Sequence, residues 1–242
     1  MSDAVSVMSD KKKQTAGFDD AWELLSPRLT PHRRERMEHV AQHRTRHIRL
    51  ALQDIHDPHN ISACMRSAEA MGVMQVDVIN LYQKFAKPSS VARGSSQWLE
   101  LGRFEDMATY LQQTKEAGVK LAAGFPSPDA IPLDQIPVDQ PLVIIFGNEH
   151  LGVHEDWLPH LDYRFTIPMV GMVESFNISV SAALSMYELT RRARATIGDE
   201  QFYLNKAQQV HMLNQWVLRH SRDPMRELNK LRQKLALNSE PS

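Results

Sequence analysis

The strongest constraint on the fold is an alternation of short apolar runs with helical segments, which begins at Ile48. Five β-rich runs predict strands: Ile48–Ile55, Val76–Leu81, Leu121–Phe125, Leu142–Phe146 and Phe165–Ile167. Helices are predicted over Ser62–Met71, Phe104–Ala117 and Ser175–Arg194, followed by glycines that can adopt positive φ, namely Gly72, Gly118 and Gly198. This alternation predicts an α/β fold with a mostly parallel sheet, helices on both faces and ligands at the carboxyl ends of the strands.

Two basic flanks surround an acidic middle. Residues 1–50 hold ten Lys and Arg against seven Asp and Glu, and residues 191–242 hold ten against five. Basic segments beside an acidic domain are typical of proteins that contact a phosphate backbone, although solvated helix faces would give the same composition. We expect a disordered tail over 1–17, a basic helical arm over 18–46, a main domain over 47–198 and a helical extension over 199–242.

Composition narrows the class of protein. No apolar run approaches the ~20 residues that cross a bilayer, so no membrane partner is expected. The single cysteine, Cys64, excludes an intramolecular disulfide and a Cys-rich zinc site, and it fits a cytoplasmic protein. We expect no metal, because the histidines that could serve as ligands lie in predicted loops without a supporting Cys or carboxylate pattern: His56, His59, His150, His154 and His160.

Several familiar catalytic motifs are absent from the sequence. The chain contains neither the glycine pattern of a dinucleotide-binding turn nor the nucleophile elbow of α/β-hydrolases. The run from Gly147 to Gly152 has the glycine spacing of a P-loop, but Val153 and His154 follow it in place of Lys and Ser or Thr. Phosphate binding of that kind is therefore excluded.

Three unusual segments fall where the predicted strands end. The first runs from His56 to Arg66, with Asn60 expected to cap the following helix. The second, Phe146–Gly152, takes a buried strand directly into a glycine turn that carries an acid. The third, Ile167–Val180, joins a glycine-containing loop to a helix start. Each alone could be an ordinary cap or turn, but three at the same edge of one sheet indicate a site.

At these segments the sequence resembles the SpoU, or TrmH, group of SPOUT-superfamily RNA ribose methyltransferases. The resemblance covers residues 47–195, and all three motifs occur in the family order. The stretch from Gly94 to Trp98 also looks like a segment of those members that methylate the D-loop guanosine at position 18 of tRNA.

The resemblance implies an α/β fold with a deep C-terminal trefoil knot, S-adenosylmethionine as cofactor, a homodimer and an RNA substrate, with tRNA expected and DNA not. It implies Arg66 as the central catalytic residue, surrounded by Asn60, Glu149, Ser175 and Asn177. It assigns the cofactor contacts to Gly124, Gly147, Ile167 and Phe176.

The chemistry limits what the arginine can do. A guanidinium is protonated at any working pH and has no acceptor, so Arg66 is a poor candidate for the general base. We expect it to grip a substrate phosphate and stabilise the developing alkoxide, while the phosphate or a water takes the proton.

Three positions depart from the family pattern. Glu174 stands where a glutamine is usual, Phe176 where a leucine is usual and Gly124 where a threonine is usual. The first could alter substrate fit, and the other two could alter the cofactor pocket.

Alternative functions follow from the same residues. The same motifs would serve an enzyme that methylates ribosomal RNA or another tRNA nucleotide. A non-catalytic RNA-binding module and a small-molecule enzyme on an open α/β sheet are rivals of other classes. The complete motifs disfavour the former, and the basic flanks disfavour the latter.

Overall fold

The computed structural model describes residues 17–82, 93–125 and 127–238, so the predicted disordered tail lies outside the described residues except for Gly17. The chain forms two compact units. One comprises residues 44–203 and the other combines the N-terminal segment before residue 44 with the C-terminal segment from Leu204. No helix in the described ranges has the length and apolar character that crossing a membrane requires.

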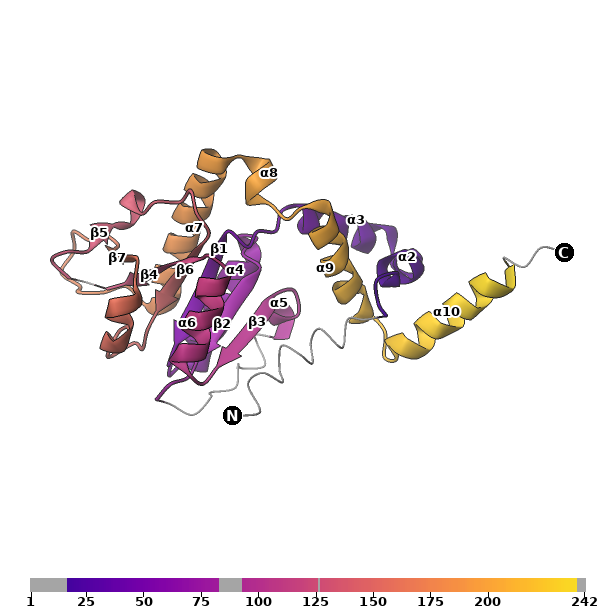
Figure 1. Ribbon diagram of the computed structural model, residues 1–242, viewed down its shortest axis with the longest axis horizontal. Coiled ribbons are helices and arrows are strands. Elements are labelled where there is room, and N and C mark those ends of the chain that lie inside the picture. The colour runs from indigo at the N-terminus through magenta and orange to yellow at the C-terminus, as the bar shows by residue number, and fades with distance from the viewer. Residues whose placement is uncertain (1–16, 83–92, 126, 239–242) are drawn as a thin grey trace. The chain divides into compact units, whose positions relative to one another are not determined.

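The larger unit is built on one sheet whose named strands all pair in parallel (Figure 1). Its strand order is β3-β2-β1-β6-β4-β7-β5. The strands span Ile48–Gln53 (β1), Gln75–Ile79 (β2), Glu100–Phe104 (β3), Lys120–Gly124 (β4), Ile131–Pro132 (β5), Leu142–Phe146 (β6) and Tyr163–Thr166 (β7). β1 is an interior strand, with Leu50 opposite both Val76 and Ile144. The predicted α/β class and parallel sheet are confirmed.

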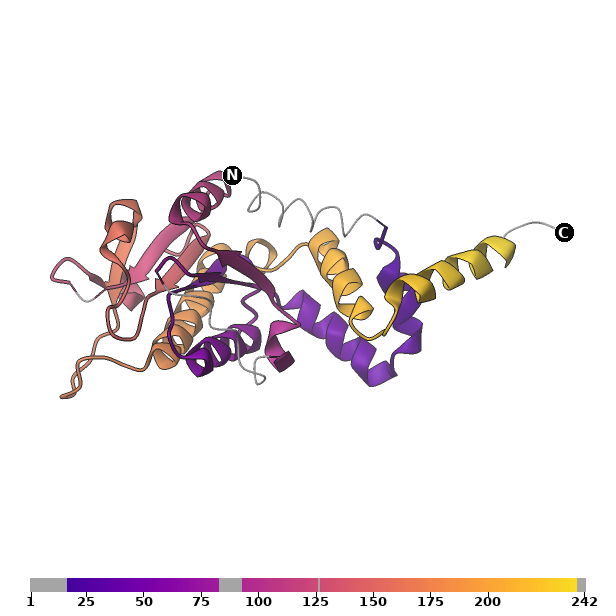
Figure 2. The same ribbon diagram turned by 90° about the horizontal axis from the view of Figure 1, so that it is seen from below.

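Helices cover both faces of this sheet, as predicted (Figure 2). Leu50 and Leu52 of β1 belong to the apolar core beneath α4 and α7, whereas Ala51 faces Tyr110 of α6 and Trp157 of η4. The side-chain alternation of a strand thus supplies both layers. The helices of this unit are α4 (Pro58–Ala70), α5 (Arg93–Ser96), α6 (Met107–Glu116), η3 (Leu133–Gln135), η4 (Glu155–His160), α7 (Ile178–Ile197) and α8 (Asp199–Phe202).

The starts of α4 and α7 differ from those predicted. Asp57 caps α4 by accepting a hydrogen bond from the backbone N–H of His59 at 2.8 Å, and Pro58 takes the first helical position. The prediction that Asn60 caps this helix is therefore wrong, and Asn60 lies in its first turn. Asn177 caps α7 through the N–H of Ser179, so Ser175 precedes the helix instead of opening it.

Strand β3 is not predicted from the sequence, because its residues, Glu-Leu-Gly-Arg-Phe, lack the β-branched side chains and the apolar run that identify strands. It is an edge strand, paired only with β2 among the described strands. Phe104 consequently ends a strand where the sequence predicts the start of a helix, and Asp106 caps α6. Gly72, Gly118 and Gly198 all adopt positive φ at helix ends, as predicted.

The smaller unit consists of helices from both ends of the chain, where a helical arm and a helical extension were predicted. They are α2 (Ala21–Leu25), η1 (Ser26–Arg28), α3 (Pro31–Gln42), α9 (Lys206–Leu218) and α10 (Pro224–Asn238). Ala21 and Leu25 pack against Val217 and Leu228 in a small apolar core. The side chain of Asn214 adds bonds to the α2 segment, accepting from the N–H of Trp22 at 2.6 Å and donating to a carbonyl at 2.9 Å.

Gly102 of β3 is required by a buried carboxylate on the next strand. A Cβ at this position would lie 2.1 Å from Oδ1 of Asp77, whose carboxyl accepts hydrogen bonds from Gln75 and from the hydroxyl of Tyr110. We expect Gly102→Ala to lower the free energy of unfolding by about 1–3 kcal/mol, the usual cost of overpacking a core. Urea unfolding measures this. Gly94→Ala is the matched control because nothing lies within 4 Å of its Cβ, and equal unfolding free energies for the two variants would contradict the prediction.

Candidate active site

The chain turns sharply where β6 ends. A Cβ on Gly147 would lie 2.0 Å from the carbonyl oxygen of Gly152, so only glycine permits this backbone approach. The side chain of Asn148 closes the turn, because its Oδ1 accepts from the N–H groups of His150 at 2.9 Å and Leu151 at 3.3 Å. The turn therefore fixes the backbone position of Glu149 just beyond the carboxyl end of β6.

Glu149 binds the segment that leaves β1. Its carboxylate accepts hydrogen bonds from the N–H of His56 at 3.1 Å, the N–H of Asp57 at 3.4 Å and Nδ2 of Asn60 at 2.8 Å. Partial burial would raise the pKa of Glu149, but the hydrogen bonds from Asn60 and from backbone N–H groups outweigh it and lower the pKa below its usual value. The carboxylate is therefore held in its charged form.

Asn60 connects Glu149 to the start of α7. Its Oδ1 accepts from Nδ2 of Asn177 at 3.2 Å, while Oδ1 of Asn177 accepts from the N–H of Ser179 at 2.9 Å and from its Oγ at 2.6 Å. Each amide therefore has a fixed orientation. One residue from each of the three sequence motifs, Glu149, Asn60 and Asn177, thus joins a single hydrogen-bonded chain.

Arg66 and Ser175 do not join this chain. Both side chains are exposed, and within the described part of the protein neither makes a hydrogen bond or ion pair. Arg66 lies six residues beyond Asn60 on α4, a rise of about 9 Å along the helix axis. The structure thus brings together three of the five predicted catalytic residues and leaves the cation and the hydroxyl facing solvent. Their roles stay predictions.

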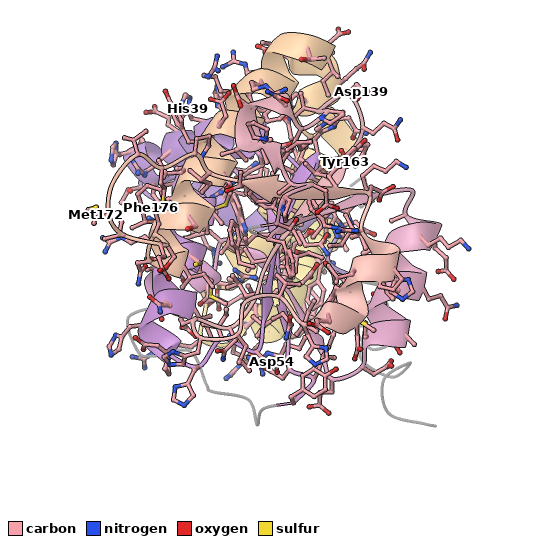
Figure 3. The ribbon with its side chains drawn as sticks, turned by 90° about the vertical axis from the view of Figure 1, so that its left-hand side faces the viewer. His39, Asp54, Asp139, Tyr163, Met172 and Phe176 are labelled. Carbon is pink, nitrogen blue, oxygen red and sulfur yellow. The ribbon has the colours of Figure 1, made fainter. Side chains whose placement is uncertain are left out.

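Three of the four predicted cofactor contacts lie at the ends of adjacent strands. Gly124 ends β4, Gly147 follows β6 and Ile167 follows β7, and the sheet order places these strands next to one another. Phe176 precedes α7 and is 38% exposed (Figure 3).

Gly124 is the position at this edge where the chain has a glycine and the family pattern has a threonine. A Cβ here would lie 3.0 Å from Cε1 of Phe146, so a threonine side chain would require the Phe146 ring to shift slightly. The edge offers backbone groups at Gly124 and Gly147, the partly exposed side chain of Ile167 and, before α7, the exposed ring of Phe176, which suit an adenosine joined to a small sulfonium centre. The residues present therefore fit S-adenosylmethionine.

Sequence reasoning overlooked two residues beside this site. Asn148 Nδ2 donates to the carbonyl oxygen of Asp54 at 2.9 Å, and Asp54 adopts a positive φ of 49°. The available signal was the tendency of Asn and Asp to bond nearby backbone and to tolerate left-handed conformations. Across residues 17–82, 93–125 and 127–238, no three His, Cys, Asp or Glu side chains form a group that could hold a metal ion.

The lowered pKa of Glu149 predicts a pH-dependent contribution to stability. Because the folded-state pKa lies below the unfolded value of about 4.3, the carboxylate stabilises fully above that value and loses its effect as the pH falls through the folded pKa. The difference in unfolding free energy between the natural protein and Glu149→Gln should therefore be constant from pH 7 to about 5.5 and shrink below about 4.3.

Urea unfolding at a series of pH values checks this prediction. Glu155→Gln, which removes an exposed carboxylate from η4, is the matched control for the loss of one negative charge. A difference that stays unchanged down to pH 3, about the lower end of carboxyl titration, would show that the hydrogen bonds to Glu149 add no stability.

Comparison with known proteins places this geometry in a family. The model of the SpoU rRNA Methylase family matches residues 47–187. A tRNA (guanosine(18)-2'-O)-methyltransferase of Borreliella burgdorferi is 32% identical over 189 residues, which cover 78% of this chain and 86% of the relative.

Solved structures share the fold. The TrmH/SpoU tRNA modifying enzyme of A. aeolicus superposes with a TM-score of 0.69 at 25% identity, covering 77% of this chain and 95% of the other. The SpoU methyltransferase AviRb of Streptomyces viridochromogenes, in complex with AdoMet, gives a TM-score of 0.55 at 24% identity, covering 63% and 60%. With its three motifs at one sheet edge and a family match over more than half its length, the chain belongs to the SpoU rRNA Methylase family.

Proposed function

We propose that this protein transfers the methyl group of S-adenosylmethionine to a ribose 2'-hydroxyl of tRNA, at the D-loop guanosine in position 18. The observation that carries the proposal is the hydrogen-bonded chain of Glu149, Asn60 and Asn177 in a member of the SpoU family. The similar tRNA (guanosine(18)-2'-O)-methyltransferases support tRNA as the substrate. AviRb, which shares the fold, was crystallised with AdoMet. A tRNA substrate would place the reaction in the cytoplasm.

When bound, the cofactor would supply a methyl group on a sulfonium, whose carbon an oxygen can attack in line while the neutral thioether leaves. The proton of the attacking hydroxyl would pass to a phosphate oxygen or to water. The main tasks of the protein are therefore to position the hydroxyl against the methyl group and to neutralise the charge that develops on the oxygen. Gly124, Gly147, Ile167 and Phe176 would hold the cofactor at the strand ends.

We assign Arg66 to binding the RNA substrate. Its guanidinium has no bonding partner in the described residues, so its donors remain available for a phosphate and for the developing alkoxide. Asn60 and Asn177 each use one amide N–H in the hydrogen-bonded chain, which leaves the second N–H of each for ribose oxygens. Ser175 stands two residues before Asn177, in the exposed segment between β7 and α7.

Basic side chains of the smaller unit would contact the RNA backbone. Not every arginine of the predicted arm is available, since Arg44 is buried in an ion pair with Glu69 and Arg46 pairs with Glu100. Arg34 is exposed but pairs with Glu38, so Arg36 of α3 is the exposed cation of the arm that we assign first to RNA.

We also propose the trefoil knot that the family resemblance implies. β7 lies between β4 and β5, both of which precede it in the chain. After it, α7 returns across the segment between β5 and β6, where Arg192 donates to the carbonyls of Leu133 at 3.3 Å and Ile136 at 2.9 Å. This return path supports a threaded C-terminal segment.

Methyl transfer to unmodified tRNA with labelled S-adenosylmethionine tests the function, with 2'-O-methylation mapped nucleotide by nucleotide. We expect methylation of the D-loop guanosine and a loss of about 100-fold or more in Arg66→Ala, the scale of losing a donor to a developing charge. Arg66→Lys should remain impaired, because an ammonium cannot bond in bidentate fashion. Lys115→Ala, a surface cation on α6, is the control.

The other outcomes separate the alternatives. Methylation of ribosomal RNA or of another tRNA nucleotide would keep the enzyme class and change the substrate. Cofactor binding without transfer to any RNA would contradict the enzyme proposal and favour a binding module. An Arg66→Lys variant with full activity would contradict the bidentate role.

A homodimer is supported by an apolar stripe on α7. Val180, Leu184 and Tyr187 are exposed at helical spacing on one face of the helix, and Phe176 precedes them. A second copy of this chain would bury the stripe, as the family resemblance implies.

Light scattering during size-exclusion chromatography tests the dimer. Leu184→Arg is expected to yield monomers at micromolar concentration, because a charge cannot be buried unpaired in an apolar interface. Val210→Arg, at a similarly exposed position on α9, should leave the mass unchanged. A Leu184→Arg protein with the mass of the unaltered dimer, or an unaltered protein that is monomeric, would contradict the assignment.

A further inference from the structure

Asp54 is the one non-glycine residue with positive φ in the described part of the chain. It directly follows β1, with a φ of 49°, and its side chain is buried. A left-handed residue is unfavourable unless its surroundings hold it in place, and such residues gather at functional sites. The contacts of Asp54 must therefore stabilise this left-handed backbone conformation.

The Asp54 carboxylate ties the end of β1 to two other segments. Oδ1 accepts from the backbone N–H groups of Leu81 at 2.9 Å and Tyr82 at 3.1 Å, in the segment after β2. Oδ2 accepts from Nε2 of Gln53 at 2.8 Å, and Oε1 of Gln53 accepts from the N–H of His154 at 2.9 Å. Both carboxylate oxygens of Asp54 and both polar atoms of the Gln53 amide therefore take part in hydrogen bonds.

The backbone carbonyl of Asp54 holds the turn that carries Glu149. It accepts from Nδ2 of Asn148 at 2.9 Å, and Oδ1 of the same asparagine closes the turn through His150. The two N–H groups that bind the Glu149 carboxylate belong to His56 and Asp57, two and three residues after Asp54. The left-handed turn at Asp54 therefore sets both the position of the carboxylate and the direction of its donors.

We propose that Gln53, Asp54 and Asn148 form a positioning network that sets the orientation of Glu149 and, through it, of Asn60. Asp54 and Gln53 are buried beneath the site, so they are positioning residues and not catalytic ones. The proposal rests on the proposed methyl transfer for its kinetic consequences, but the geometry can be tested without that activity.

An exchange of hydrogen-bonding groups gives the sharpest test. Asp54→Asn keeps a residue that tolerates left-handed backbone but turns one acceptor into a donor facing the donor of Gln53. Gln53→Glu instead places two carboxylates together. In the double variant, the carboxylate introduced at position 53 accepts from both the new amide at position 54 and the N–H of His154, so every donor again faces an acceptor. Net charge is the same in the double variant and the natural protein.

The expected kinetic result is a loss followed by rescue. Each single variant should lower kcat for RNA methylation by about 10- to 100-fold, with a KM for S-adenosylmethionine changed by about 2-fold or less, since misplaced groups slow the reaction without removing the cofactor contacts. The double variant should recover kcat to within about 3-fold, a coupling that a double-mutant cycle measures. Asn148→Asp keeps the two acceptor contacts of the turn and loses only the donor to Asp54, so it should behave like the single variants.

A spectroscopic readout separates this inference from the proposed function. In the natural protein the amide resonances of His56 and Asp57 should titrate with the Glu149 carboxyl, and the single variants should abolish this coupling while the double variant restores it. If no RNA is methylated, the proposed function fails and the titration still tests the network. Single variants with full kcat and unchanged amide titration, or a double variant that regains thermal stability without regaining the titration, would overturn it.

Discussion

The parallel pairing of β1 with β6 is the interaction on which the rest of the larger unit depends. Ile48 to Leu52 lie opposite Leu142 to Phe146, and all of these residues except Arg49 are buried. Because parallel strands end at the same edge, this pairing brings the segment after β1 beside the turn after β6. Two segments about 90 residues apart in the chain thereby meet, and their polar groups are satisfied by each other instead of by water.

The site that results is held by hydrogen bonds between loops and needs little contribution from apolar contacts. Glu149 is a charged acceptor surrounded by an amide side chain and backbone donors, which is why its pKa is lowered despite partial burial. Asn60 and Asn177 transmit that orientation to the start of α7. Arg66 stays outside, a cation without a partner among the described residues, beside an ordered set of neutral and negative groups. Such an arrangement suits the proposed reaction, because Glu149, Asn60 and Asn177 are oriented before the substrate binds. The guanidinium of Arg66 would then form its ion pair only when a substrate phosphate is bound.

The sequence allowed the class of fold to be predicted because the buried strands are continuous apolar runs and the helices end at glycines with positive φ. It failed at β3, where an edge strand needs no apolar pattern, and at the start of α4, where Asp57 and Pro58 cap the helix earlier than Asn60. The motif residues of the site could be named through the family resemblance. Their hydrogen-bonding order could not, because it depends on a backbone turn at Asp54 and on side-chain amides whose partners lie far away in sequence.

The insertion of β6 between β1 and β4, and of β7 between β4 and β5, has a consequence for how the protein reaches its native state. Neither strand completes its hydrogen bonding until both of its neighbours are in place, and one neighbour of β6 lies about 90 residues earlier in the chain. Pairing across such separations is slow because the entropy of closing the loop must be lost before any contact forms. The segments that follow β6 and β7 carry Glu149 and Asn177, so the site cannot form before both strands have paired. During refolding, catalytic competence would therefore lag behind the recovery of helical structure.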